Sequence, residues 1–141
     1  MKRLVASFLL ALAMACQSAS DAPTDPVWGK QACSACAMLV SEPHFAAQVL
    51  TVAGDHLYFD DVGCMAAFLL RGKVPPKKAW VRDADGADRA ERKWVTTELS
   101  HFSKGAKTPM DYGFQFSATG ELPWSAVQDA VRERLTSGSE R

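Results

Sequence analysis

The sequence predicts an α+β fold built from two small, related ββα-type units that pack together. Short apolar runs between turn residues predict the strands, and two segments with helical periodicity predict the helices. The double proline Pro75-Pro76 marks a boundary between the units. The chain has 141 residues, 48% of them hydrophobic, which is enough for one ordinary domain or two very small ones. Because either unit alone would bury little apolar surface, we expect the two units to pack against each other.

The first unit is predicted over residues 28–74, in the order strand, strand, helix. Its elements are a β-branched and apolar strand over residues 45–52, a turn over 53–55, a return strand over 56–59 and a helix over 62–71. Asp60 or Asp61 precedes the helix as an N-cap, and Gly72 ends it. We interpret the two adjacent carboxylates as a helix cap and a hairpin end, not as metal ligands.

The second unit is predicted over residues 75–141 and repeats the first in outline. Its elements are strands over residues 79–82, 93–97 and 113–117, a turn at Asp85-Gly86, a C-terminal helix and a polar tail over 136–141. The helix is the clearest in the chain. Pro123 suits its first turn, and apolar residues recur at three- and four-residue steps from Trp124 to Leu135.

Residues 1–15 have the pattern of an export signal. Two basic residues, Lys2 and Arg3, precede an apolar run that is too short to span a bilayer as a stable helix. The run ends at Ala13-Met14-Ala15-Cys16, which resembles a bacterial lipobox, where cleavage precedes the cysteine and acyl chains such as palmitate are attached. A lipoprotein anchored through Cys16 is favoured over the alternative, plain secretion after a small-residue cleavage site.

The segment after the signal, residues 16–27, is predicted to be a flexible tether, because it is rich in Ser, Ala, Asp, Thr and Pro. In the whole chain, 16 Lys and Arg balance 16 Asp and Glu. Removing Lys2 and Arg3 with the signal leaves about 14 basic side chains, so the mature protein has no excess of positive charge. We therefore expect no nucleic-acid partner and a membrane attachment that depends on the acyl chains of Cys16.

The three other cysteines carry most of the functional information. Cys33 and Cys36 form a CxxC motif, whose spacing serves disulfide exchange, metal binding or a structural bridge. Cys64 lies in the apolar helix and is interpreted as a small buried hydrophobic residue. Met38 follows the motif, and Met110 lies in a turn-rich segment where a thioether is not an obvious choice. Thiolates and thioethers together select soft cations such as copper(I).

Four segments of the chain resemble the NosL family in order and approximate spacing. They are Cys33-Ser-Ala-Cys36-Ala-Met38-Leu-Val, Phe45-Ala-Ala-Gln48-Val, Tyr58-Phe-Asp-Asp61-Val-Gly-Cys64-Met, and Pro109-Met110 with Gly113. The resemblance covers nearly all of the mature domain. The chain departs from the family's pattern at Ala37, where the family usually has Gly, and at Asp111-Tyr112, which interrupts the usual Pro-Met-Gly.

This resemblance implies two related ββα units in a copper(I)-binding lipoprotein, anchored in the bacterial cell envelope and facing the periplasm. It implies a metallochaperone that is not an enzyme and that delivers copper, by thiolate and thioether ligand exchange, to a copper-accepting client such as nitrous oxide reductase. The family's metal cysteine falls on Cys36 and its metal methionine on Met110, with Cys33 and Met38 near the site. Met38, Cys33 or a histidine is left to complete the ligand set, and His44 is the histidine nearest the CxxC motif in sequence.

Two other functions use the same motif. A periplasmic thiol-disulfide oxidoreductase would use Cys33 and Cys36 as its redox pair, but such enzymes place the motif at the start of a helix, and Pro43 stops any long helix here. In the other alternative the motif is a structural clip in a lipoprotein with no catalytic role. Other enzyme classes find no support, since the sequence has no glycine-rich phosphate loop, nucleophile elbow or paired histidines for catalytic zinc.

Overall fold

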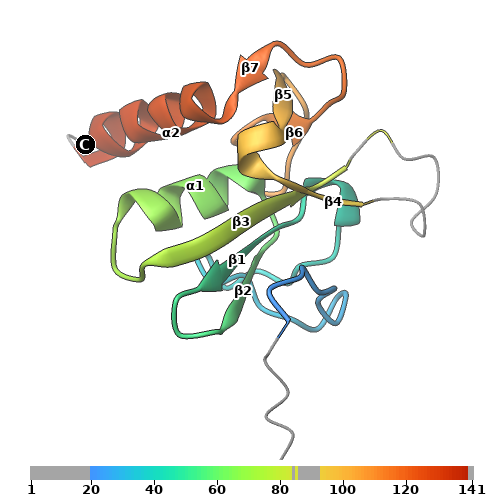
Figure 1. Cartoon of the computed structure of the whole chain (residues 1–141). Helices are drawn as coiled ribbons and strands as arrows, with labels where there is room; N and C mark the ends of the chain where they lie inside the picture. Colours follow the sequence, from blue (N-terminus) through green and yellow to red (C-terminus); the bar gives the residue numbers. More distant parts are fainter. Residues whose placement is uncertain (1–19, 84, 86–92, 140–141) are drawn as a thin grey trace, which may run out of the picture.

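A computed structural model describes residues 20–83, 85 and 93–139 of the chain (Figure 1). The predicted signal peptide, Cys16 and Gly86 of the predicted turn lie outside these residues. Within the described ranges, no helix combines the length and the apolar character that crossing a membrane would require.

The described part of the chain folds into two antiparallel sheets and two α-helices, so the predicted α+β class is confirmed. The first sheet has the strand order β2-β1-β3-β4, with β1 (Ala47–Thr51), β2 (His56–Phe59), β3 (Pro76–Arg82) and β4 (Trp94–Thr96). The second has the order β6-β5-β7, with β5 (His101–Lys104), β6 (Phe114–Phe116) and β7 (Leu122–Pro123). Two short 3-10 helices are η1 (Pro43–Phe45), before β1, and η2 (Thr97–Leu99), after β4.

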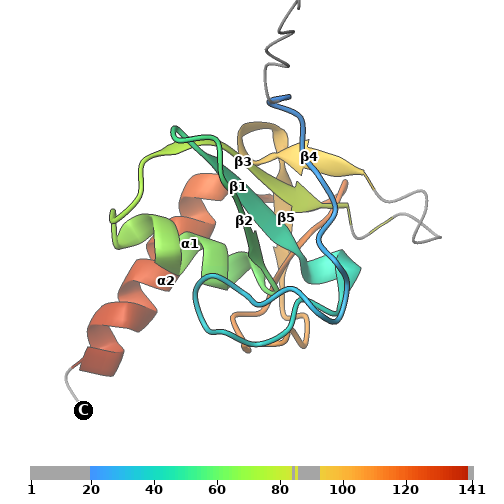
Figure 2. The same ribbon diagram turned by 90° about the horizontal axis from the view of Figure 1, so that it is seen from below.

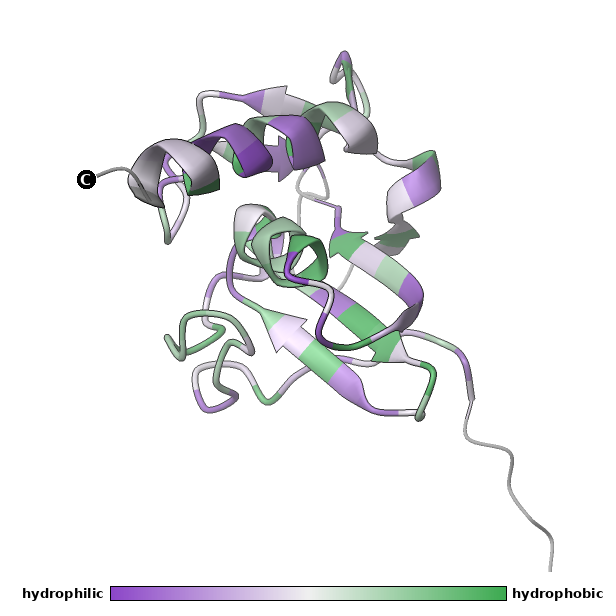
Figure 3. Cartoon of the chain, turned by 90° about the vertical axis from the view of Figure 1, so that its left-hand side faces the viewer, coloured by the Kyte–Doolittle hydropathy of each residue, from purple (hydrophilic) through white to green (hydrophobic). Residues whose placement is uncertain are grey.

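The helices stack on the four-stranded sheet as two further layers. Helix α1 (Val62–Leu70) covers one face of the sheet, and α2 (Trp124–Ser139) packs on α1 from the side away from the sheet (Figures 1 and 2). Because α1 has the sheet on one side and α2 on the other, its surface is mostly apolar, whereas α2 has a polar outer face (Figure 3). The core between these layers includes Phe59 of β2, Met65 of α1 and Val131 of α2, all fully buried.

Residues 20–26 run across the face of this sheet that lies opposite α1 (Figure 2). The side chain of Gln48 is fully buried there, and its amide pairs with the main chain of Thr24: Oε1 accepts from the Thr24 N–H at 3.1 Å and Nε2 donates to the Thr24 carbonyl at 3.0 Å. Asp25 accepts hydrogen bonds from Arg82 of β3 and from the Trp94 indole of β4. The predicted tether over residues 16–27 therefore contacts the sheet along its described part, which its composition did not indicate.

Four features differ from the predicted elements. Strand β5 was not predicted, because only one of its four side chains is buried and no apolar alternation marks it. The two-residue strand β7 was not predicted either, and it includes Pro123, which precedes the helix instead of lying in its first turn. Strands β3 and β4 join the first sheet, since β3 pairs with β1 across the predicted boundary at Pro75-Pro76. Helix α2 continues to Ser139, into the predicted polar tail, where the hydroxyls of Thr136 and Ser137 donate to carbonyls of the preceding turn.

Replacing Gln48 with the similarly sized Met tests the attachment of residues 20–26. The substitution leaves the Thr24 amide and carbonyl without their buried partner, so we expect the free energy of unfolding to fall by about 1–3 kcal/mol. Urea unfolding of the purified protein measures this change. The matched control, Gln115→Met in β6, should change it by less than about 0.5 kcal/mol, and equal effects of the two variants would contradict the prediction.

Candidate metal centre

The CxxC motif lies in a tight loop beside the edge strand β2. An isolated antiparallel bridge joins Ala32 to Leu39 at the base of the loop, and the Cys33 N–H donates to the Met38 carbonyl at 2.7 Å. The Ser34 N–H donates to the Tyr58 carbonyl of β2 at 2.8 Å, which fastens the loop to the sheet. Ala37 has φ of 64°, in the left-handed region that favours glycine.

The junction between β2 and α1 carries the other half of the site. Asp61 is the N-cap of α1, and its Oδ1 accepts from the Gly63 N–H at 2.7 Å. An N-cap of this kind stabilises a helix by about 1 kcal/mol. Asp60, one residue earlier, is not the cap but lies beside the thiols, and Cys64 lies in the first turn of the capped helix.

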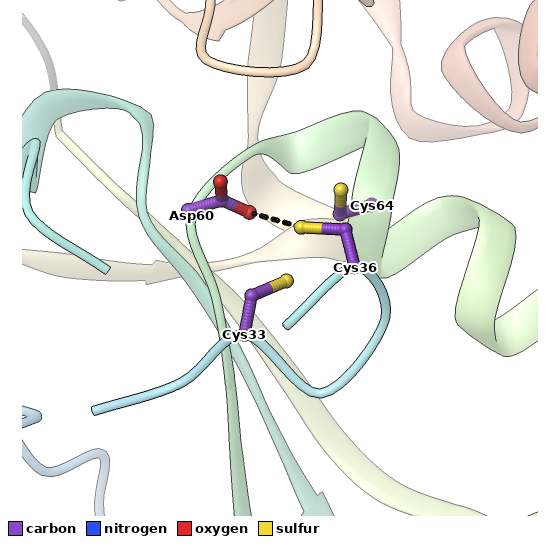
Figure 4. A group of neighbouring side chains, drawn as sticks. All are labelled: Cys33, Cys36, Asp60 and Cys64. Atoms are coloured by element: carbon purple, nitrogen blue, oxygen red, sulfur yellow. Dashed lines mark hydrogen bonds between the residues drawn. The ribbon is translucent and has the colours of Figure 1, made fainter. Parts of the chain in front are cut away.

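The loop and the junction bring four side chains together: Cys33, Cys36, Asp60 and Cys64 (Figure 4). Their three sulfur atoms and one carboxylate oxygen all lie within 4.8 Å of one another, so the group can hold a metal ion. The Cys36 thiol donates to Asp60 Oδ1 at 3.4 Å. All three cysteines are free thiols. We call these four residues the thiol cluster.

The thiol cluster has one accessible member. Cys33, Asp60 and Cys64 are only 3%, 2% and 2% exposed, whereas Cys36 is partly exposed. An ion in the cluster is therefore held from the protein side by buried ligands. A second molecule can reach it only from the side of Cys36.

The acidic groups of the thiol cluster shift one another's proton affinity. A hydrogen bond from Cys64 lowers the pKa of Cys33 to about 4, and the same bond raises the pKa of Cys64 far above its ordinary value. Burial raises the pKa of Cys36 to about 11 and that of Asp60 to about 6. At neutral pH the cluster thus holds the Cys33 thiolate and the Asp60 carboxylate, and its other two thiols keep their protons until a cation replaces them.

The donor set defines which ions suit the thiol cluster. Three cysteine sulfurs within 4.8 Å of one another favour a soft or borderline cation, and copper(I) and zinc both accept thiolate ligands. A hard cation such as calcium or magnesium needs six or more oxygen ligands, and the cluster offers the carboxylate of one residue. The geometry therefore supports a metal site for a thiophilic ion.

The structure places the four predicted metal residues in different surroundings. Cys33 and Cys36 belong to the thiol cluster. Met38 is 58% exposed, on the outer side of the CxxC loop. Met110 is half-buried against the core, and its N–H donates to Asp61 Oδ2 at 3.0 Å, which places its loop at the first turn of α1. Ligation by Met38 and Met110 stays a prediction.

Two members of the thiol cluster were not predicted as site residues. Cys64 is buried in the core as expected, but its sulfur also belongs to the cluster, so its interpretation as a hydrophobic residue alone was incomplete. Asp60 was interpreted as structural, and its carboxylate in fact lies beside the thiols. One sequence signal could have predicted both residues. Asp60 and Cys64 are four residues apart at the start of a helix, and one helical turn brings side chains with this spacing close together.

The three histidines, all within the described ranges, lie outside the thiol cluster. His44, the candidate nearest the CxxC motif, lies 3.8 Å from Glu42 and has its ring 4.0 Å from that of Phe45. His56 hydrogen-bonds to Gln48, and His101 to the Gly120 carbonyl. A histidine ligand is thus not part of the cluster that the fold assembles.

Comparison with known proteins supports the fold. No protein-family model matches the chain, and no curated protein matches it. Among solved structures, the chain is similar to the crystal structure of the copper chaperone NosL from Shewanella denitrificans, with a TM-score of 0.55 and 19% sequence identity. The similarity covers 79% of this chain and 87% of that one. At this level of identity the likeness shows a NosL-like fold.

The accessibility of Cys36 predicts the order in which thiol reagents react. Iodoacetamide should modify Cys36 of the reduced, folded protein first, although Cys33 is the more acidic thiol, because Cys33 and Cys64 are buried. Since the pKa of Cys36 is raised, its rate of modification should keep increasing above pH 9. Peptide mapping by mass spectrometry identifies the modified residue, and faster labelling of Cys33 would contradict the arrangement.

Proposed function

We propose that the protein is a copper(I) metallochaperone that binds the ion at the thiol cluster and passes it to a client protein by ligand exchange. The observation that carries the proposal is the convergence of Cys33, Cys36 and Cys64 with Asp60 within 4.8 Å. The fold supports it, because the chain is similar in structure to a copper chaperone.

A thioether ligand would distinguish copper(I) from zinc, because both ions accept the thiolates of the cluster. Copper(I) is soft and accepts two or three thiolates, with a thioether as an additional ligand, whereas zinc in proteins is bound by thiolate, imidazole and carboxylate. The thiol cluster has three sulfur donors and lacks a histidine among its members. Met110 lies on a loop that is hydrogen-bonded to the same helix start, where its thioether would add to a copper site.

The pattern of burial suits uptake and release of the ion. The thiolate of Cys33 provides the first ligand, and binding to Cys36 and Cys64 displaces one proton from each thiol. The Cys36 thiol donates to Asp60, so the carboxylate stands next to one departing proton. Release begins at Cys36, the accessible ligand, where a thiolate or thioether of the client can replace it while Cys33 and Cys64 still hold the ion.

The cellular setting completes the proposal. A lipid anchor on Cys16 would hold the protein on a membrane of the bacterial cell envelope, facing the periplasm. The client would be a copper enzyme that is loaded there, with nitrous oxide reductase as the first candidate. Copper(I) is the cargo of this protein, not a catalytic cofactor.

A thiol-disulfide oxidoreductase is the competing function. The CxxC motif lies in a loop that ends at the bridge residue Leu39, so the motif does not begin a helix whose dipole would activate an exposed thiol. The more acidic thiol, Cys33, is also the buried one. An insulin reduction assay separates the functions, because the metallochaperone should show no activity above that of Cys33→Ser.

Copper(I) titration tests the ligands. The reduced protein should bind one equivalent in competition with a chromophoric copper(I) chelator. Cys36→Ser and Cys64→Ser should each weaken binding by more than about 100-fold, beyond the 10–100-fold typical of substitutions next to a metal site. Ser34→Ala, an exposed residue between the two motif cysteines, is the control and should bind like the parent protein. Full affinity in Cys64→Ser would contradict a role for the thiol cluster.

The number of protons released on copper(I) binding distinguishes two ligand sets: the three cysteines of the thiol cluster, or one cysteine together with Met110. Cys36 and Cys64 have raised pKa values and are protonated at pH 7, whereas Cys33 is already ionised. Copper(I) binding by all three should release about two protons between pH 6.5 and 8.5, so the Kd should rise about 100-fold for each unit of falling pH. Calorimetry in buffers of different ionisation enthalpy counts these protons, and release of one proton or none would contradict three-thiolate binding.

A further inference from the structure

The loop that carries Met110 is closed at its base and joins two strands of the second sheet. It spans residues 105–113, between β5 and β6, and the Gly105 N–H donates to the Gly113 carbonyl at 2.9 Å. Inside it, the Asp111 N–H donates to the Thr108 carbonyl and the Gly113 N–H to the Thr108 hydroxyl. Asp111 has φ of 57°, a left-handed conformation that the loop imposes on a residue with a side chain. We call residues 105–113 the Met110 loop.

Asp61 is the first attachment of the Met110 loop to the rest of the protein. Its carboxylate is fully buried and has both oxygens in use: Oδ1 caps α1 through Gly63, and Oδ2 accepts from the Met110 N–H at 3.0 Å. Removing either partner would leave a buried polar group unpaired, which is costly. The cap of the helix that carries Cys64 is therefore also the acceptor that holds Met110.

Tyr112 and Gly63 make the second attachment. A Cβ at Gly63 would lie 2.0 Å from the Tyr112 ring, so the ring packs directly on the backbone of the first turn of α1. Burial raises the pKa of the Tyr112 hydroxyl, in keeping with a ring that is packed against the protein. A larger residue at position 63 would exclude the loop from this position.

Arg134 of α2 makes the third attachment, from the outside. Its guanidinium donates to the Asp111 carbonyl at 2.6 Å and to the Met110 carbonyl at 3.4 Å, and it lies 4.3 Å from the centre of the Tyr112 ring. One side chain thus binds three consecutive residues of the Met110 loop. A guanidinium provides several donors and a flat face at once, which a lysine ammonium does not.

We propose that Asp61 and Arg134 are positioning residues that clamp the Met110 loop against the first turn of α1 and so hold the Met110 thioether at the thiol cluster as a copper(I) ligand. This inference rests on the proposed function. Because the same helical turn carries Asp61 and Cys64 and directly follows Asp60, the clamp fixes the loop relative to the thiols. The hydrogen bonds from Arg134 to the Met110 loop are exposed to solvent, whereas the Asp61 carboxylate is buried. The Arg134 contacts are therefore the ones that can break when copper leaves.

A double-mutant cycle tests the clamp through the Kd of copper(I). Met110→Leu alone and Arg134→Gln alone should each raise the Kd about tenfold, which corresponds to about 1.4 kcal/mol. The double variant should bind no more weakly than either single variant, because the thioether contributes only while the clamp holds it. A purely structural role of Arg134 would make the two losses multiply to about 100-fold, and that result would overturn the proposal.

Controls separate the clamp from general damage. Arg132→Gln removes an exposed arginine of α2 that pairs with Asp129, and it should leave the Kd unchanged. Asp61→Asn keeps an oxygen to cap α1 but turns an amide toward the Met110 N–H, so it should behave like Arg134→Gln in the same cycle. If Arg134→Gln does not fold, Arg134→Lys replaces it, with the same expected coupling to Met110.

The outcomes also distinguish this inference from the proposed function. If Met110→Leu binds copper(I) with unchanged affinity, the Met110 loop does not position a ligand and the clamp is overturned. Loss of copper(I) binding in Cys36→Ser would still support the copper site in that case. Unchanged affinity in Cys36→Ser overturns both. Unchanged affinity in Arg134→Gln, with a tenfold loss in Met110→Leu, overturns only the clamp.

Discussion

The junction at which β2 ends and α1 begins is the constraint on which the site depends. Within five residues it provides the carboxylate of Asp60, the helix cap of Asp61 and the thiol of Cys64. Because Asp61 caps α1, the helix begins at a defined residue, and the side chains of Asp60 and Cys64 have fixed positions relative to each other. The CxxC loop, fastened to β2 through Ser34, then needs only to bring Cys33 and Cys36 to this junction. The four ligand atoms meet because the first turn of α1 directly follows β2 and the CxxC loop is hydrogen-bonded to the same strand.

The close approach of four acidic groups has an electrostatic consequence. Three thiols and a carboxylate lie within 4.8 Å of one another. The hydrogen bond from Cys64 lowers the pKa of Cys33 and raises that of Cys64, while burial raises the pKa of Cys36 and of Asp60. In the proposed function, a copper(I) ion would take the place of the protons on Cys36 and Cys64. Three members of the thiol cluster are buried and Cys36 is accessible. In the proposed function the buried members would retain the ion and Cys36 would be the point of exchange.

The sequence predicted the local elements better than it predicted their assembly. The hairpin of β1 and β2, the capped α1 and the start of α2 follow from alternation, turn residues and capping, all of which are local. The pairing of β3 with β1, and the binding of Thr24 by the buried Gln48, depend on contacts between distant residues that no local pattern shows. For the site, the CxxC motif predicted Cys33 and Cys36, whereas an apolar helix concealed the second role of Cys64. Asp60 was missed because only the fold shows that the adjacent carboxylates point to different partners, thiols for Asp60 and main-chain amides for Asp61.

In the proposed function, the sulfur atoms of three cysteines that the fold brings together bind the copper(I) ion. X-ray absorption spectroscopy at the copper edge of the reduced, copper(I)-loaded protein tests this claim most directly, because it identifies the atoms bound to the metal. We expect a shell of sulfur atoms that includes three thiolates, and we expect it to lose one sulfur in Cys64→Ala. A shell dominated by nitrogen or oxygen, or a spectrum that Cys64→Ala leaves unchanged, would contradict it.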